Sequence, residues 1–189
     1  MMMKKCFLLL LLGASSLSPW AHALEYNAVV AKDSKIDFVY TQMNVPVEGI
    51  FKAFDAQIQF DPAKPESTSA KIDIDLNSID LGSDEANTEV KRKPWFNLAV
   101  FPKATFSSQS VKSLGNDRYE VTGELDIKGK KQAVVLPVVV KQLDAKVEFS
   151  GQFVLKRLQF NIGEGAWSDT ETVADDVTIK FSVIATAKP

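Results

Sequence analysis

Apolar and polar residues alternate through most of this chain, and that period of two constrains the fold more than any other feature. Segment 70–77 is typical and reads Ala-Lys-Ile-Asp-Ile-Asp-Leu-Asn. Successive side chains of a β-strand point to opposite faces, so such a segment predicts a half-buried strand with one solvated face. The same alternation marks seven further segments, the last three more weakly: 56–60, 119–127, 149–155, 177–185, 36–41, 103–108 and 133–141.

Turn residues separate these segments and support an all-β fold. Segments 61–65, 115–117 and 128–130 carry the Pro, Gly and Asn residues that are typical of turns between strands. Eight or so amphipathic strands predict an antiparallel sandwich or a closed barrel, and closure would remove exposed sheet edges. Pro137 lacks a backbone N–H, so its strand is expected to lie at an edge or to bulge there.

One segment departs from the alternation. Residues 83–93 predict a short helix, with Ser83 as its cap, acids in the first turn and Lys-Arg-Lys in the last. The aromatic connection follows, which we define as residues 95–102 and which reads Trp-Phe-Asn-Leu-Ala-Val-Phe-Pro. It is either a plug at one barrel end or a lid over an apolar cavity. The basic run 91–93 could touch a membrane, although charge placement at a helix end explains it equally well.

The first 23 residues have the layout of a secretory signal peptide. Two lysines precede a short apolar run, and Ala-His-Ala at 21–23 provides a small-residue cleavage site. The apolar run is too short to cross a membrane as a helix. We therefore expect residues 1–23 to be removed, which leaves one domain, 24–189, in the bacterial periplasm.

The single cysteine and the single histidine, Cys6 and His22, both lie in the segment expected to be removed. The mature chain then lacks nucleophile–histidine pairs and His or Cys metal ligands. Carboxylate catalysis needs inward acids, and the alternation places nearly all acids outward. We expect no enzyme activity, no cofactor and no metal site. With 20 basic and 24 acidic residues remaining, the mature chain is not expected to bind nucleic acid.

Five segments, in this order and spacing, resemble the YceI-like family of bacterial secreted and cytoplasmic proteins. They are Asn-Ser-Ile-Asp-Leu-Gly-Ser-Asp-Glu-Ala at 77–86, Trp-Phe-Asn with Phe-Pro-Lys-Ala-Thr-Phe within 95–106, Tyr-Glu-Val-Thr-Gly-Glu-Leu-Asp-Ile-Lys-Gly at 119–129, Phe-Asn-Ile-Gly-Glu-Gly-Ala-Trp at 160–167, and Val-Ala-Asp-Asp-Val at 173–177. The resemblance extends from about Tyr26 to Ala185. It implies a lipocalin-like, eight-stranded antiparallel barrel around a long apolar cavity that holds a polyisoprenoid or a similar amphiphile.

The chain departs from the commoner family pattern at one point. Many members carry Arg-Asp-x-His-Leu before the aromatic pair, whereas residues 88–91 here read Thr-Glu-Val-Lys. This is similar to a histidine-less branch whose members are encoded beside, or fused to, b-type cytochromes. The resemblance therefore implies no histidine that binds the head group of a ligand in this chain.

The candidate ligand-binding residues are large apolar side chains in the inward phase of strands or in and near the aromatic connection. They are Phe38, Phe51, Phe54, Ile72, Ile74, Trp95, Phe96, Phe101, Phe106, Tyr119, Val121, Phe149, Phe153, Phe160 and Trp167. Core filling is the alternative for each, because an eight-stranded barrel is either filled by side chains or holds one ligand. Gly123 and Gly151, inward in their strands, leave room for a ligand or another backbone, or mark a barrel corner. Arg157, among inward residues, suggests a ligand head group or a buried carboxylate as its partner.

These features predict a periplasmic protein that sequesters or carries a long isoprenoid-type lipid. Apolar burial would drive uptake, and the aromatic connection would open for loading at a membrane. Transient membrane contact and a homodimer stay open. The alternative is an accessory partner of a membrane b-type cytochrome that binds an isoprenoid quinone.

Overall fold

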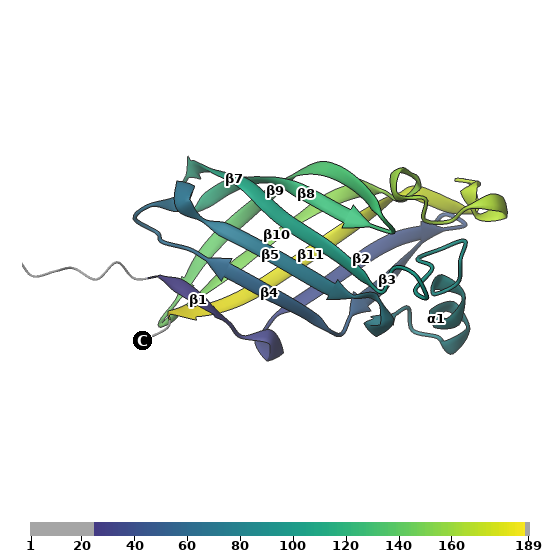
Figure 1. The fold of residues 1–189 in the computed structure, drawn as a ribbon, viewed down its shortest axis with the longest axis horizontal. Coiled ribbons are helices and arrows are strands. Elements are labelled where there is room, and N and C mark those ends of the chain that lie inside the picture. Colours follow the sequence, from purple (N-terminus) through teal and green to yellow (C-terminus); the bar gives the residue numbers. More distant parts are fainter. Residues whose placement is uncertain (1–24, 188–189) are drawn as a thin grey trace, which may run out of the picture.

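The computed structural model describes residues 25–187, so the predicted signal peptide lies outside the described residues. Within this part of the chain, eleven strands and one α-helix, α1 (Asp84–Val90), form an all-β fold (Figure 1). The strands are β1 (Tyr26–Val29), β2 (Lys35–Gln42), β3 (Val45–Phe51), β4 (Phe54–Gln59), β5 (Ser69–Asp75), β6 (Ile79–Asp80), β7 (Lys103–Gly115), β8 (Arg118–Ile127), β9 (Lys130–Leu143), β10 (Lys146–Lys156) and β11 (Val173–Ala187). Five short 3-10 helices lie between them: 31–33, 65–67, 76–78, 157–160 and 165–168.

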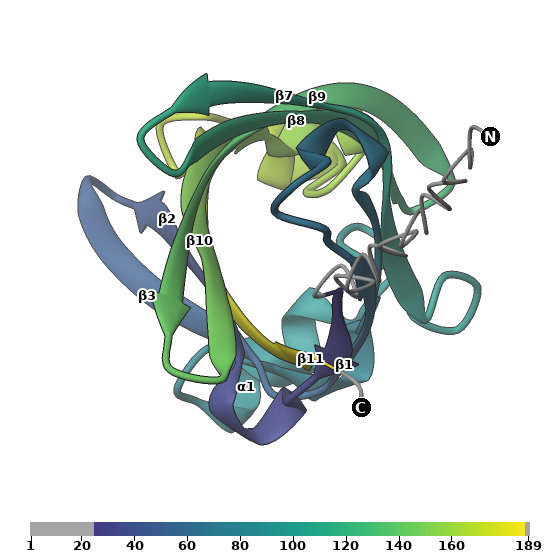
Figure 2. The ribbon, with the colours of Figure 1, turned by 90° about the vertical axis from the view of Figure 1, so that its left-hand side faces the viewer.

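All strands belong to one antiparallel sheet, which curls on itself. Its order is β4-β5-β7-β8-β9-β10-β11-β2-β3-β6, and β1 pairs separately with β11. Seen end-on, the strands surround a central space, with α1 behind it (Figure 2). The two sides of the curl meet where Tyr26 of β1 and Phe60 exchange backbone hydrogen bonds of 2.9 and 3.1 Å. The fold is therefore the predicted lipocalin-like barrel, and not two packed sheets.

Each of the eight predicted strands is present, and three more occur: β1, β3 and β6. Strand β3 escaped prediction because Pro46 and Gly49 interrupt its alternation. The glycine has a packing reason, since a Cβ there would lie 2.3 Å from the ring of Phe38 on the neighbouring strand β2. The other two strands are too short, at four and two residues, to show a period.

Pro137 lies on β9, which is inside the sheet order and not at its edge. Strand β9 pairs with β8 over 130–139 and with β10 only over 139–143. Pro137 therefore lies just beyond the end of the β10 ladder, on the side where its missing N–H costs no ladder bond. This part of β9 is a local edge of the sheet, because β10 does not pair with it.

The helix begins as predicted but ends earlier. The Ser83 hydroxyl accepts a hydrogen bond from the Ala86 N–H at 3.2 Å, as a cap does. The helix stops at Val90, whose carbonyl accepts from the Phe96 N–H at 3.1 Å as the chain turns back. The prediction that basic residues 91–93 occupy the last helical turn is wrong, because they lie in the turn that follows.

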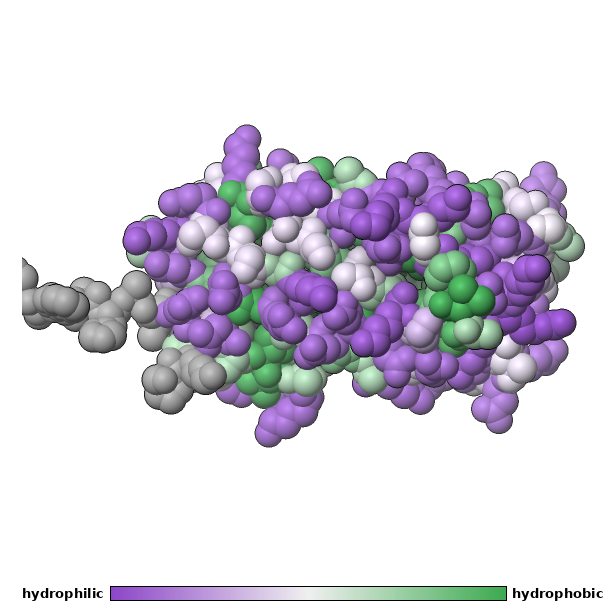
Figure 3. Space-filling model, in the orientation of Figure 1, coloured by the Kyte–Doolittle hydropathy of each residue, from purple (hydrophilic) through white to green (hydrophobic). Residues whose placement is uncertain are grey.

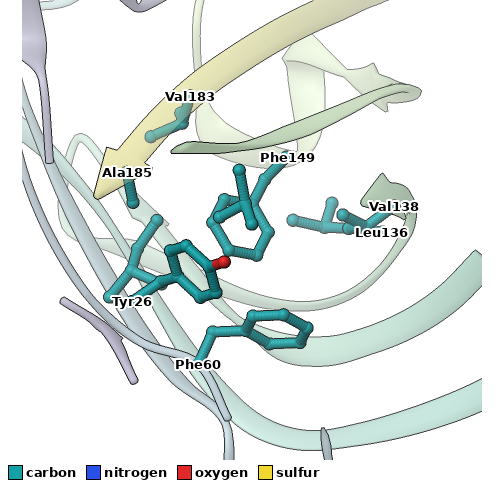
Figure 4. Packing of buried hydrophobic residues seen from close by; sticks show 9 residues of the cluster. Tyr26, Phe60, Leu136, Val138, Phe149, Val183 and Ala185 are labelled. Carbon is teal, nitrogen blue, oxygen red and sulfur yellow. The ribbon is translucent and has the colours of Figure 1, made fainter. Parts of the chain in front are cut away.

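One end of the curled sheet, which we call the packed end, is filled by aromatic rings. Phe60 meets Phe149 edge-on, with ring centroids 5.2 Å apart (Figure 4), and it meets Tyr119 edge-on at 5.9 Å. Tyr26 lies beside them, only 1% exposed, and its hydroxyl is hydrogen-bonded to Gln142. Edge-to-face rings of this kind form a tightly packed core. The packed end lies beside β1 and the end of β11, opposite to α1 (Figure 1).

The outward phase of the strands is polar, as the alternation predicts. The face in Figure 3 is mainly hydrophilic, with small hydrophobic areas between the charged and polar side chains. No helix within residues 25–187 combines the length and the apolar character needed to cross a membrane.

Candidate functional site

The curled sheet encloses a cavity of about 1090 Å³. Its walls come from nearly every strand, because inward side chains of successive strands face one common interior. The volume lies just above the usual range for small-molecule sites. Side chains therefore do not fill this barrel completely. The lining runs from Phe149 and Val183 of the packed-end cluster to residues of α1, so the space suits an elongated guest.

Eleven of the fifteen predicted ligand-binding residues line this cavity. They are Phe38, Phe51, Ile72, Ile74, Trp95, Phe96, Phe106, Val121, Phe149, Phe153 and Trp167. They come from strands β2, β3, β5, β7, β8 and β10, from the turn after α1, and from the 3-10 helix 165–168. The inward phase thus becomes an almost wholly apolar wall. Ligand contact by these residues stays a prediction.

The other four predicted residues do not line the cavity. Tyr119 packs on Phe60 at the packed end, and burial raises the pKa of its hydroxyl. Phe160 is 1% exposed within the core. Phe54 lies half-buried at the start of β4, and the ring of Phe101 lies over the turn at Gly129. Tyr119 and Phe160 therefore fill the core, which is the alternative that the sequence left open for each candidate residue.

The two inward glycines make room for the protein itself and not for a ligand. A Cβ at Gly123 would lie 2.5 Å from the Ser107 carbonyl and as close to the Phe106 ring. A Cβ at Gly151 would lie 2.2 Å from the Pro137 carbonyl. Both positions therefore serve the close approach of a neighbouring strand.

The cavity has a polar rim at the end that carries α1. We define the rim as six lining residues, namely Ser83, Asp84, Glu85, Thr88, Glu89 and Arg92. Within it, the Arg92 guanidinium donates to the Glu89 carboxylate at 2.9 Å. Tyr40, farther along the lining on β2, has its pKa raised by burial. A long amphiphile in this cavity would find apolar walls inside and hydrogen-bonding groups at one end.

Asp80 fixes the chain as it enters the rim. Its carboxylate accepts from the Lys52 ammonium at 2.6 Å, from the Gly82 N–H at 2.9 Å and from the Asn87 amide at 3.2 Å. The Lys52 contact first, and then the Gly82 N–H, hold the pKa of Asp80 well below its usual range. Asn87 in turn accepts from the Leu81 N–H at 2.7 Å. Side-chain bonds thus hold the start of α1 in place.

Arg157 has a different role from the one that its position suggested. It is 2% exposed, lines the cavity and lies 5.7 Å from the ring of Trp95. Its guanidinium makes five hydrogen bonds, all to backbone carbonyls: those of Ile162, Gly163, Trp167, Val173 and Ala174. Burial lowers its pKa. A guanidinium has five N–H donors, so neither a carboxylate nor a ligand is needed to satisfy it.

A second buried cation, Lys128, ties the loop 157–168 to the turn after α1. Its ammonium donates to the carbonyls of Lys93 and Asn161 at 3.0 and 2.6 Å, and to the Glu164 carboxylate at 2.7 Å. The hydrogen bond from Lys128 lowers the pKa of Glu164. Because all three ammonium donors are used, this lysine organises two loops and offers nothing to a ligand.

The aromatic connection forms a fixed part of the wall. The Pro94 carbonyl, just before it, accepts from the Gly163 and Glu164 N–H groups at 2.9 and 2.8 Å. The rings of Trp95 and Trp167 lie 5.2 Å apart. The indole N–H of Trp95 is buried and has no hydrogen-bond partner among residues 25–187. A ligand oxygen that reached this N–H would accept its hydrogen bond. These bonds favour the plug over the lid.

The rim was not predicted from the sequence. In the sequence these charges are explained by their placement at the ends of a short helix, and only the topology brings residues 83–92 to the mouth of the barrel. Lys128 was missed as well, because its partners, two backbone carbonyls and the Glu164 carboxylate, belong to distant segments. Within the described residues, no three Asp or Glu side chains are placed to hold a metal ion.

Comparison with known proteins shows which family has this architecture. The profile of the YceI-like domain matches residues 28–185. A UPF0312 protein of Azotobacter vinelandii is 32% identical over 71% of this chain and 72% of its own. The crystal structure of Burkholderia cenocepacia BcnA is 47% identical, covers 84% of this chain and 99% of its own, and has a TM-score of 0.82. A polyisoprenoid-binding domain from Saccharophagus degradans, 19% identical over 88% of this chain and 100% of its own, shares the fold with a TM-score of 0.68.

Proposed function

The chain belongs to the YceI-like family, and we propose that it binds one long, flexible isoprenoid-type ligand with the tail inside the barrel and the polar end at the rim. The observation that carries this proposal is the shape and chemistry of the cavity. About 1090 Å³ of space is walled mainly by apolar side chains from most strands, and most of the polar lining residues lie at the end that carries α1. The site therefore suits an amphiphile.

Apolar burial supplies the driving force. Each Å² of apolar surface removed from water contributes about 25 cal/mol, so a tail of several isoprene units gains several kcal/mol. Loss of the ligand's own freedom offsets part of that gain. Support also comes from the Saccharophagus degradans domain, which has the same fold and is described as polyisoprenoid-binding.

Native mass spectrometry of protein purified from its own host tests the proposal directly. We expect a population heavier than the polypeptide by the mass of one lipid, and extraction should recover that lipid. A polypeptide that stays at its apo mass, and that takes up no added isoprenoid, would contradict the proposal.

A pair of matched substitutions tests whether the cavity is the site. Ala70 lines the cavity on β5, whereas Ala133 is exposed on β9. Ala70→Phe fills the interior and should weaken binding of a 20-carbon isoprenoid at least tenfold. Ala133→Phe adds the same ring outside and should leave affinity unchanged. The mature chain has two tryptophans, Trp95 and Trp167, and both line the cavity, so their fluorescence reports occupancy.

We also propose that the protein acts in the periplasm, which rests on the signal-like sequence of residues 1–23. Fractionation of the host followed by N-terminal sequencing should place the protein there and begin at Leu24. A mature protein that still begins at Met1 would exclude cleavage. A homodimer, transient membrane contact, and a quinone-binding role beside a b-type cytochrome stay predictions from the sequence.

A further inference from the structure

An apolar surface on β9 and β10 breaks the polar pattern of the barrel's outer face. We define the outer patch as Val135, Pro137 and Val139, which occupy successive outward positions on β9, together with Val154, which points outward on β10. The three valines are 52%, 46% and 58% exposed. Three of the eight large hydrophobic residues that are exposed within residues 25–187 thus lie on two neighbouring strands. Such a cluster on a surface that is otherwise polar marks an interaction site.

Strand β9 is apolar on both of its faces. Residues 134–140 read Val-Val-Leu-Pro-Val-Val-Val, without a polar residue at either phase. A continuous apolar run of this kind is typical of a strand that is covered on both sides. The barrel covers only the inner side, where Leu136 and Val138 line the cavity. The outer side therefore has the composition of a buried surface, although nothing within one copy of the described chain buries it.

The outer patch also lies over a seam in the barrel wall. We define the seam as residues 130–138 of β9 and 151–156 of β10, which follow each other in the sheet order but form no ladder pairs with each other. Val135 and Val154 lie on its two sides. A partner on the outer patch would cover these unpaired strand edges, which otherwise stay open to water or to other chains.

The charges on the two sides of the outer patch have opposite signs. Glu120 on β8 lies opposite Pro137 in the sheet, on the same outward face. Lys180 on β11 lies opposite Gln152 of β10, and both are exposed. Neither Glu120 nor Lys180 forms an ion pair within the described part of the chain. The apolar centre thus has an acid one strand away on one side and a base one strand away on the other.

We propose that the outer patch is the interface of a homodimer, in which two barrels pack side by side about a twofold axis that runs along the strands over the seam. Such an axis sets β9 of each copy over β10 of the other, so the valines of the two patches meet. It also exchanges the two sides of the patch, so Glu120 of each copy faces Lys180 of the other. The two residues lie at one level, because the β9–β10 register, extended by two residues, sets Pro137 beside Gln152.

Charge complementarity favours a second copy over other partners. A twofold interface contains every contact twice, so the surface must match itself. The outer patch meets this condition, because an acid on one side and a base on the other exchange places under the axis. The interface lies on the outside of the barrel, so this inference does not depend on the proposed function.

Sedimentation velocity of the protein without residues 1–23, over a range of concentrations, tests the proposal. We expect a reversible monomer–dimer equilibrium with a Kd of about 1–100 μM, as for a small interface. Val135→Glu places a charge at the centre of the outer patch and should raise this Kd by about tenfold or more. Val45→Glu is the matched control on β3, because Val45 is 59% exposed, and it should leave the Kd unchanged.

Charge reversal tests the orientation of the two copies. Glu120→Lys and Lys180→Glu each place like charges across the interface, so each should raise the Kd about tenfold at low ionic strength. The double variant restores opposite charges and should return the Kd to within about twofold of the wild type. Within one copy the two side chains lie three strands apart, roughly 14 Å, so an ion pair inside one barrel does not explain such a recovery.

Three results would overturn the homodimer. The first is a protein that stays monomeric at every concentration, and the second is a Kd that Val45→Glu raises as much as Val135→Glu does. The third is a double charge reversal that recovers no affinity, which would exclude the twofold arrangement. A monomer that instead sediments with phosphatidylethanolamine vesicles, and loses them on Val135→Glu, would show that the outer patch meets lipid and not a second copy. Lipid binding inside the barrel is unaffected by any of these results.

Discussion

At the packed end of the sheet, aromatic rings meet edge-on and Tyr26 is almost wholly buried, whereas at the rim a seven-residue helix stands over an apolar cavity. The packed end is held by side-chain packing, which is collective and costly to disturb. The rim end has buried apolar residues as well, but its loops are joined by polar groups: the Asp80 carboxylate accepts hydrogen bonds, and Lys128 and Arg157 donate them. The same sheet thus combines a packed end filled by rings with an end whose loops are joined by polar contacts beside the open part of the cavity.

Truncation of one ring at each end should separate stability from binding most clearly. Phe60→Ala removes a 3% exposed ring at the packed end and should lower the free energy of unfolding by about 3–5 kcal/mol. Phe153→Ala removes a half-buried ring that faces the cavity, so the loss should be smaller, but isoprenoid affinity should fall. Urea unfolding and Trp fluorescence titration measure the two effects. Equal losses of stability would show that the cavity wall is packed as tightly as the packed end.

Removal of the buried guanidinium tests whether polar groups hold the other end. Arg157→Met keeps an apolar chain of similar length but leaves five carbonyls without their donor, so we expect a loss of about 3 kcal/mol. The near-UV circular dichroism of Trp95 and Trp167 should weaken too, because the loop 157–168 carries Trp167. Arg118→Met, at an exposed arginine on β8, is the control and should cost less than about 0.5 kcal/mol.

Loss of one hydroxyl at the packed end should have a modest effect. Tyr26→Phe keeps the ring and removes the hydrogen bonds between its hydroxyl and Gln142, which measure 2.8 and 3.1 Å. The free energy of unfolding should fall by about 1 kcal/mol, as for a typical hydrogen bond. Differential scanning calorimetry measures it. A loss as large as that of Phe60→Ala would mean that the hydroxyl, and not ring packing, joins β1 to the rest of the sheet.

The packed end could be predicted from the sequence more completely than the rim. Alternation is a local signal, so eight of the eleven strands and most of the inward rings followed from it. Strand β3 was hidden because Pro46 and Gly49 break its period, although Gly49 serves the Phe38 ring. Open space inside the barrel could not be predicted from the sequence, because inward rings can either fill a barrel or line a cavity.

The rim depended on contacts between distant segments, which no local pattern records. Arg157 and Lys128 bond almost entirely to backbone carbonyls, and every residue type carries that group. The carboxylates of α1 look like any solvated helix face until the topology sets them at the mouth. The cap at Ser83 was predictable because capping is local, whereas the helix end at Val90 depended on a hydrogen bond from Phe96.

The smallest expected effect concerns Asp80, the half-buried carboxylate that precedes α1. Asp80→Asn removes the ion pair with Lys52 but keeps an oxygen for the Gly82 N–H, so Tm should fall by only about 1–3 °C. Folding lowers the pKa of Asp80, so its charged form stabilises the native state above the ordinary pKa near 3.9, and the benefit fades as the pH falls toward the lowered value. The Tm difference between wild type and Asp80→Asn should therefore be constant from pH 5 to 8 and shrink below about pH 4. A difference that grows on acidification would show that the Lys52 contact does not hold the rim in place.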